Sequence, residues 1–349
     1  MDIDLPTPDN PITRETLERL HELTKPGPVL IMTHESPDPD ALASGKAIGT
    51  LLETAWGIPC RLVYSGLVAR AENRAMLDLL ATEWQAITKI DHIHDYSATI
   101  LVDTQPGAGN NRFPTDQIPK IVIDHHHPLR DGLNKVPYVD VRPEVGSTVS
   151  MTYQYLESAG ITPGPVLATA MFYGLQTDTL GLARGATLVD ESVYIKLLAW
   201  LDRSLLIQVE QAGLSRDYFR AFSAGLLAAR VYDHSVIAFL GDMTRPDLAA
   251  EMADVLIRLE TARAVLCLGV YQQTLHLSLR SVGTAEDAGH LVQRVVTPHG
   301  KAGGHGTMAG GQVPLNGLDV QEVVNNIEHR FLEALKETSQ GEPLIPPSR

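Results

Sequence analysis

The segment VLIMTHESPDPDALAS, residues 29–44, places an apolar run directly before a cluster of ionisable side chains. His34, Asp38 and Asp40 follow this run, and small residues with helical spacing come next. Carboxylates that lie close together repel each other and lose hydration on burial, so they gather beneath an apolar strand chiefly where they share a cation. The segment therefore predicts a strand, a metal-binding loop and a helix. Alternatively, the two aspartates flanking Pro39 form a turn that caps the helix.

Strand and helix patterns alternate through the first two hundred residues. The strand patterns cover residues 28–34, 61–65, 98–104 and 120–126, and the helical patterns cover residues 13–24, 39–56 and 72–81. Nearly continuous runs of Val, Ile and Leu are typical of parallel strands that are covered on both faces. These features predict an α/β fold with an N-terminal parallel sheet, followed by several helices from residue 147 onward.

A second α/β pattern occupies the C-terminal part of the chain. Its strand patterns cover residues 235–241, 264–271 and 275–281, and its helical patterns cover residues 247–260, 287–296 and 319–339. The short YQQT segment predicts a hairpin and hence a mixed sheet. We expect a catalytic domain at 1–205, a helical linker at 206–232, and a smaller substrate-binding domain at 233–349, with a cleft between the domains. We expect the end, 341–349, to be irregular.

Composition and charge exclude several classes of protein. No apolar run of the 349-residue chain approaches the roughly 20 residues of a membrane span, and the acidic start MDIDLPTPDN is unlike a signal peptide. We therefore expect a cytoplasmic protein without a membrane partner. The net charge of −14 argues against a long basic groove for polymeric nucleic acid. A small anionic substrate stays possible, because bound divalent cations reverse the local field.

Some residues with reactive side chains have a simpler interpretation. Cys60 and Cys267 lie within strand patterns, which favours small buried side chains over a disulfide. His92 and His94 have the spacing of metal ligands, but their segment is polar, so we expect a surface loop.

Further ionisable groups follow the other predicted strands. Asp103 closes one strand, Asp124, His125 and His126 close another, and Asp178 follows an apolar helical pattern. The carboxyl ends of parallel strands meet at one edge of a sheet, where ligands bind. Six carboxylate and imidazole ligands suit two divalent ions about 3.5–4 Å apart, and this mixture favours Mn²⁺, with Mg²⁺ possible.

Four short motifs carry a resemblance to a known family. THESPDPDA, LVDT, VIDHH and QTDT, in this order, resemble the motifs of the DHH phosphoesterase superfamily. That group contains RecJ-type nucleases, family II pyrophosphatases, cyclic-di-AMP phosphodiesterases and nanoRNase/pAp phosphatases. Farther on, KAGGHGTMAGG at 301–311 is similar to the glycine-glycine-histidine motif of the DHH-associated domain 1.

The resemblance implies roles for individual residues. The implied metal ligands are His34 and Asp38 for one ion, Asp40, His125 and Asp178 for the other, and Asp103 bridging the two. Asp124 would orient a ligand or support the adjacent histidine, because ligating imidazoles normally need an acceptor for their second nitrogen. His126 would face the substrate phosphate and act in catalysis.

The resemblance also implies a substrate-binding set in the C-terminal domain. Gly303 and Gly304 would let the backbone approach an anion, and His305 would donate to phosphate. Arg280 and Ser281 resemble the arginine-serine pair of nanoRNase-like members and would bind the distal phosphate or the base.

By this resemblance the chain is expected to be a two-metal phosphoesterase that forms a homodimer. Its expected substrates are short oligoribonucleotides, linear dinucleotides such as pApA, or 3′-phosphoadenosine 5′-phosphate, cleaved to mononucleotides. Pro39 stands where many members have glycine, and HPLRDGLN lacks an asparagine found in many nanoRNases, so the substrate class stays open. The alternatives are an exopolyphosphatase or pyrophosphatase acting on phosphoanhydrides, and a non-catalytic nucleotide sensor.

Overall fold

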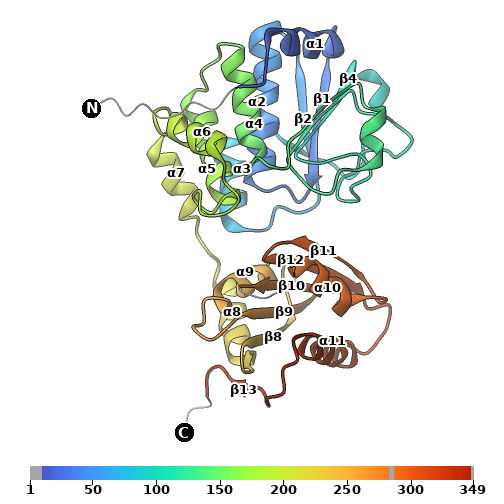
Figure 1. Ribbon diagram of the computed structural model, residues 1–349, viewed down its shortest axis with the longest axis vertical. Coiled ribbons are helices and arrows are strands. Elements are labelled where there is room, and N and C mark those ends of the chain that lie inside the picture. The colour runs from blue at the N-terminus through green and yellow to red at the C-terminus, as the bar shows by residue number, and fades with distance from the viewer. Residues whose placement is uncertain (1–9, 283–286, 347–349) are drawn as a thin grey trace. The chain divides into compact units, whose positions relative to one another are not determined.

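The computed structural model describes residues 10–282 and 287–346 of the chain. The chain divides into two compact units, unit 1 spanning Met1–Ala212 and unit 2 spanning Gly213–Arg349 (Figure 1). The boundary between them lies inside the segment 206–232, which the sequence analysis assigns to a helical linker.

Unit 1 is built on a six-stranded sheet in which every pairing is parallel, as the sequence predicts. In spatial order its strands are β3 (Gln85–Ala86), β2 (Cys60–Ser65), β1 (Val29–Glu35), β4 (Ala98–Val102), β5 (Ile121–Asp124) and β6 (Tyr138–Val141). The two edge strands are absent from the prediction, because β3 is only two residues long and β6 lacks a continuous apolar run. The central strands β1, β4 and β5 carry the motifs to one edge of the sheet.

The α-helices of unit 1 cover one face of this sheet. They are α1 (Arg14–Thr24), α2 (Pro39–Trp56), α3 (Ala71–Leu80), α4 (Thr148–Ser158), α5 (Pro165–Asp178), α6 (Leu188–Leu198) and α7 (Arg203–Glu210). Val29 and Ile31 of β1 belong to the apolar cluster on that face. Leu30 and Met32 point to the opposite face, where Phe113 and other residues of irregular or 3-10 segments cover them. Both faces are therefore covered, although no α-helix among the described residues contributes to the second cluster.

Unit 2 contains a seven-stranded mixed sheet. Its spatial order is β11 (Lys301–His305), β12 (Met308–Pro314), β10 (Thr274–Ser281), β9 (Ala264–Tyr271), β8 (Ser235–Asp242), β7 (Arg230–Val231) and β13 (Glu342–Pro343). Among the described strands of this sheet, only β8 and β9 pair in parallel. The predicted β9–β10 hairpin is confirmed, and Gln272 and Gln273 at its tip have φ of 46° and 62°, as a two-residue type I′ turn requires.

Helices pack on both faces of the unit 2 sheet. They are α8 (Arg216–Ala228) and α9 (Leu248–Leu256) on one face, and α10 (Ala288–Val296) and α11 (Val320–Leu335) on the other. Among the described residues, no helix combines the length and the apolar character that crossing a bilayer requires.

Two segments of unit 2 differ from the sequence prediction. The glycine-rich motif forms the β11–β12 hairpin, which periodicity misses because glycine supplies no alternating side chains. The end of the chain is not wholly irregular, since β13 pairs with β7 and the Leu344 N–H donates to Ala229 O. Main-chain hydrogen bonds, which leave no pattern in the sequence, hold this segment together with the Arg230 side chain, which donates to Gly341 O, and the packing of Leu344. Residues 347–349 lie outside the described residues.

Helix α2 provides a test of how closely the layers of unit 1 pack. A Cβ atom at Gly45 would lie 2.5 Å from Trp84 Cζ2, whereas one at Gly49 would lie 3.4 Å from Leu62 Cδ1. We predict that Gly45→Ala destabilises the protein by about 1–2 kcal/mol, because overpacking outweighs the helix propensity of alanine. Gly49→Ala should instead be neutral or stabilising by up to about 1 kcal/mol.

Urea unfolding of the two variants beside the wild type measures this difference. Equal stability of the two variants would contradict the packing argument.

Candidate metal centre

Seven of the eight residues predicted to bind metal or act in catalysis come from segments that end or follow strands β1, β4 and β5. His34 lies in β1, Asp38 and Asp40 lie at the start of α2, Asp103 follows β4, Asp124 ends β5, and His125 and His126 follow it. The eighth, Asp178, is the last residue of α5. The carboxyl ends of these adjacent parallel strands bring the residues together, as the topology predicts.

The first group of potential ligands comprises His34, Asp38 and Asp103, whose ligand atoms lie within 4.8 Å of one another. His34 Nε2 is 3.8 Å from Asp38 Oδ1 and 3.5 Å from Asp103 Oδ2. His34 Nδ1 donates to Glu35 O at 2.9 Å. This bond leaves Nε2 as the nitrogen that faces the carboxylates, which is the tautomer that a metal ligand needs.

The second group comprises Asp40, His125 and Asp178, again within 4.8 Å. His125 Nε2 lies 3.9 Å from Asp40 Oδ2 and 3.3 Å from Asp178 Oδ2. His125 Nδ1 donates to Val145 O at 3.1 Å, so a main-chain carbonyl fixes this imidazole in the same way as that of His34. These two groups hold the residues that the family resemblance assigns to each ion, and a third possible group joins Asp103 with His125 and His126.

Asp103 faces both groups. Its Oδ2 points to His34, while its Oδ1 lies 3.8 Å from His125 Nε2. Buried Asp103 Oδ2 and Asp178 Oδ2 both lack a hydrogen-bond partner, and each belongs to a different group. A buried oxygen without a partner is costly, and a cation on each side would satisfy it. Asp103 also has a φ of +60°, a sparsely populated conformation that is common at functional sites.

Asp38 combines the two roles that its sequence context offers as alternatives. Its Oδ1 accepts a hydrogen bond from the Ala41 N–H at 3.0 Å and caps α2, and the same oxygen faces His34. Capping and a place in the cluster are therefore compatible. Asp40, two residues later, points inward, and its side chain is 1% exposed.

The start of α4 surrounds Asp40 with donors. Ser147 Oγ donates to Asp40 Oδ1 at 2.6 Å, the Val149 N–H donates to the same oxygen at 2.7 Å, and the Thr148 N–H donates to Oδ2 at 2.8 Å. The segment GSTVS contains no ionisable side chain, so the sequence predicts a helix here but not its contacts with Asp40. A Ser-Thr pair that opens a helix after a strand is the signal that could have found them.

Asp124 accepts from His126 and not from the adjacent ligand candidate His125, whose Nδ1 donates to Val145 O instead. His126 Nδ1 donates to Asp124 Oδ1 at 2.8 Å, and Gln105 Nε2 donates to Asp124 Oδ2 at 2.7 Å. Burial lowers the pKa of His126, but Asp103 and Asp124 raise it more strongly, to about 10. Gln105, which no sequence pattern indicates, also holds the loop by donating to His126 O.

The acids and imidazoles shift one another's proton affinities. Burial lowers the pKa of His34, but Asp103 and Asp38 raise it well above its usual value. Burial and the nearby Asp103 raise the pKa of Asp40, and burial raises the pKa of Asp178 to about 6. Without a cation, protons therefore neutralise part of the clustered charge.

Arg184, which is not among the predicted site residues, brings a positively charged side chain to this cluster. Its Nη2 donates to the main-chain oxygen of Asp178 at 2.6 Å and lies 4.0 Å from Asp178 Oδ1. The signal is an arginine in the loop that follows the fourth motif.

In unit 2, strand register aligns two of the predicted substrate-binding residues. Arg280 and His305 both pair with Met308, so they occupy one row across β10, β12 and β11. Ser281 is buried, and side chains alternate along a strand, so it points to the sheet face opposite Arg280. Position 304 requires glycine, because a Cβ atom there would lie 2.4 Å from Met308 O. Gly303 is exposed and has open space around it.

The Arg280 side chain is held by three acceptors on the α9 side of the sheet. Its Nε donates to Asp254 Oδ1 at 2.5 Å, and its Nη1 donates to Ser278 Oγ at 2.9 Å and Leu279 O at 3.0 Å. These bonds fix the orientation of the guanidinium group.

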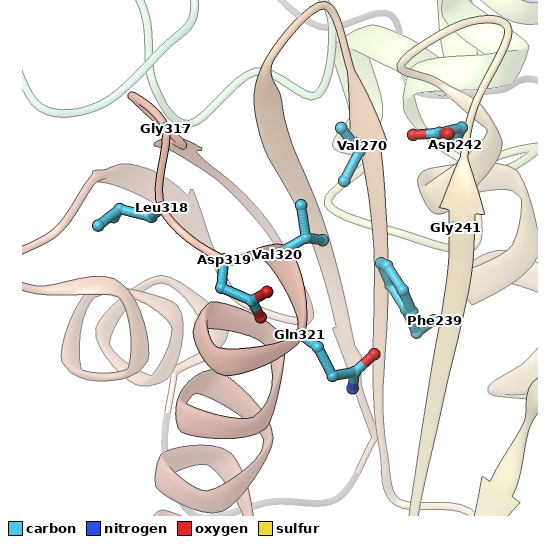
Figure 2. A pocket seen from close by; sticks show the side chains of 9 residues that line it. All are labelled: Phe239, Gly241, Asp242, Val270, Gly317, Leu318, Asp319, Val320 and Gln321. Carbon is cyan, nitrogen blue, oxygen red and sulfur yellow. The ribbon is translucent and has the colours of Figure 1, made fainter.

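Unit 2 also contains a cavity of about 710 Å³ at the carboxyl ends of β8 and β9. Figure 2 shows Asp242 at the end of β8 and Asp319 at the first turn of α11, on its lining. Val270 lines the cavity near the end of β9, whereas Arg280 pairs with Val265 near the start of that strand. The cavity is therefore at the other end of the strands from the predicted substrate-binding row.

Comparison with known proteins identifies the two parts of the chain. The model of the DHH family N-terminal domain matches residues 28–175, and that of the DHHA1 domain matches residues 233–337. An uncharacterized protein of Methanocaldococcus jannaschii is 32% identical over 302 residues, covering 86% of this chain and 60% of the relative.

A probable manganese-dependent inorganic pyrophosphatase of Streptococcus agalactiae is 26% identical over 186 residues, covering 53% of this chain and 58% of the relative. The chain thus spans about 60% of the length of these curated relatives.

Solved structures share the fold. An exopolyphosphatase-related protein from Bacteroides fragilis superposes with a TM-score of 0.75 at 17% identity, covering 93% of this chain and 98% of that one. RecJ from Thermus thermophilus in complex with Mn²⁺ gives 0.54 at 16% identity, covering 93% of this chain and 54% of RecJ. With its ordered motifs and both family domains, the chain belongs to the DHH superfamily and combines a DHH domain with a DHHA1 domain.

Proposed function

We propose that this protein is a metal-dependent phosphoesterase that uses two divalent cations, Mn²⁺ in preference to Mg²⁺. The observation that carries the proposal is Asp103, a buried carboxylate whose two oxygens face two different groups of ligands. His34 and Asp38 would complete one site, and Asp40, His125 and Asp178 would complete the other. Oxygen and imidazole donors in these numbers suit divalent cations.

The chain's own residues would divide the reaction between them. Divalent cations in such a site supply a nucleophilic water at neutral pH and neutralise charge on the phosphoryl oxygens. His126, oriented by Asp124, would donate a proton to the leaving-group oxygen as its bond to phosphorus breaks, and then regain a proton from solvent. Arg184 would add positive charge on the side of Asp178.

The substrates we propose are short oligoribonucleotides, linear dinucleotides such as pApA, or 3′-phosphoadenosine 5′-phosphate. The DHHA1 domain supports this choice, since the resemblance places its glycine-histidine motif in nucleotide-cleaving members. Arg280 would bind a distal phosphate. The net charge of −14 favours a short substrate over a long nucleic acid.

A second candidate is hydrolysis of a phosphoanhydride such as pyrophosphate or polyphosphate. The manganese-dependent pyrophosphatase relatives and the exopolyphosphatase-related fold neighbour favour it. Both reactions would use the same metal-binding residues of unit 1, so the substrate-binding unit would decide between them.

Substrate choice can be measured directly. With Mn²⁺ present, we predict turnover of pApA, of RNA oligomers of two to about five nucleotides or of 3′-phosphoadenosine 5′-phosphate, and little turnover of pyrophosphate or of a 24-nucleotide RNA. Asp103→Ala should reduce turnover to background, because it removes the carboxylate shared by both groups. His94→Ala is the control, since His94 is exposed and lies outside the cluster.

Turnover of pyrophosphate alone would replace the first candidate by the second. Nucleotide binding without any turnover, at full metal content, would favour a non-catalytic sensor.

Metal binding should release protons. The pKa values of His34 and His125 lie above their usual value, although burial lowers both, because the nearby aspartates raise them more strongly. At pH 7.5 a fraction of these imidazoles is therefore protonated, and each must lose its proton to bind a cation. We predict net proton release when Mn²⁺ binds, decreasing as pH rises through these pKa values.

Calorimetric titration in two buffers of different ionisation enthalpy gives the number of protons. Proton uptake, or release that His34→Ala leaves unchanged, would count against the assignment.

We expect Arg280 to contribute to substrate binding and not to metal binding. We predict that Arg280→Gln raises KM about 10–100-fold, because a charge-assisted hydrogen bond contributes roughly 1.5–3 kcal/mol, with Mn²⁺ affinity unchanged. The control is Lys301→Gln, which also removes one positive charge. Lys301 pairs with Gln312 at the end of the β11–β12 hairpin away from Arg280, so this variant should have little effect. Equal KM values for the two variants would exclude a specific role for Arg280.

A further inference from the structure

Thr148, the first residue of α4, contacts carboxylates of both potential metal sites. Its N–H donates to Asp40 Oδ2 at 2.8 Å, and its Oγ1 donates to Asp103 Oδ1 at 2.7 Å. The Thr148 side chain is fully buried and lies outside the four motifs. One residue therefore connects an aspartate of the second group with the aspartate that faces both.

The hydroxyl determines how the Asp103 carboxylate is turned. With Oδ1 engaged by Thr148, Oδ2 points toward His34 and has no hydrogen-bond partner. Rotation of the carboxylate would break a short bond in a site that water does not reach freely, and a buried hydroxyl without an acceptor is costly. An acceptor has two lone pairs, so Oδ1 can accept from Thr148 and still face His125.

We propose that Thr148 is a positioning residue that holds Asp103 in the orientation needed to bridge two cations. This inference rests on the proposed metal function. In this view, the orientation of Asp103 depends on the Thr148 hydroxyl at the start of α4 as well as on the metal ligands. Groups that orient metal ligands typically change metal affinity about 10–100-fold when they are removed.

Asp190 keeps this helix start in place. Its buried carboxylate accepts from the Gly146 N–H at 3.0 Å and from Ser150 Oγ at 2.6 Å, on both sides of Thr148. The same carboxylate accepts from the N–H and Oγ1 of Thr187, which caps α6. The Thr148 hydroxyl is thus presented by a segment that is anchored at two points.

The test compares substitutions that differ in the hydroxyl. Thr148→Val removes it and keeps the side-chain shape, while Thr148→Ser keeps it and loses a methyl group. Thr152→Val is the matched control, because Thr152 is also buried in α4 but donates to the main-chain oxygen of Val149 at 3.1 Å. Binding of Mn²⁺ is followed by calorimetry, and magnetic coupling between two bound ions is followed by electron paramagnetic resonance.

We expect Thr148→Val to weaken at least one Mn²⁺ binding step about 10–100-fold and to reduce the coupled signal. Thr148→Ser and Thr152→Val should bind Mn²⁺ as the wild type does. Affinities within twofold for Thr148→Val and the wild type, with the coupled signal intact, would overturn the inference. If Thr148→Val does not fold, Thr148→Ala against Thr148→Ser isolates the hydroxyl in the same way.

These measurements do not depend on turnover. Failure to hydrolyse any phosphoester would refute the proposed function and leave the metal-binding result standing. Unchanged metal binding in an active Thr148→Val enzyme would refute only the role of Thr148.

Discussion

Repulsion between buried carboxylates is the constraint on which the structure of unit 1 depends. The side chains of Asp40 and Asp103 are each 1% exposed. Both of them, and Asp178 as well, lie close to the imidazole of His125. Such a cluster would be expensive if its charges were uncompensated. The carboxylates come together because the carboxyl ends of parallel strands lie at one edge of the sheet. The same topology places imidazoles and helix N-termini at that edge, where they offset the negative charge.

Two helix starts supply part of this compensation. Asp38 caps α2, and the start of α4 gives Asp40 two main-chain N–H groups and the Ser147 hydroxyl. A helix N-terminus favours negative charge, so these contacts stabilise the ionised forms. Buried Asp103 Oδ2 and Asp178 Oδ2 receive no such hydrogen bond. The protein's own donors therefore satisfy the carboxylate of Asp40. They leave one oxygen of Asp103 and one of Asp178 without a hydrogen bond, facing the potential metal ligands.

The sequence predicts those parts of the site that leave a chemical pattern. Asp103 and His125 follow Val/Ile/Leu runs, so both the strands and their position at one edge can be predicted. Thr148 and Gln105 cannot be found in this way, because neutral polar residues are common in loops and their importance comes from contacts across the fold. The β11–β12 hairpin escapes prediction for a related reason. Its glycines permit close strand approach, as Gly304 shows, but they provide no hydrophobic period.

Strand geometry also separates two residues that sequence resemblance treats as a pair. Arg280 and Ser281 are adjacent, but side chains alternate between the faces of a strand. Arg280 contacts Asp254 of α9, whereas Ser281 is 2% exposed, and its N–H donates to Thr307 O. A ligand on the Arg280 face can reach that guanidinium group without reaching the Ser281 hydroxyl. The two side chains therefore lie on opposite faces of the sheet, with the buried Ser281 at the junction between β10 and the turn of the β11–β12 hairpin.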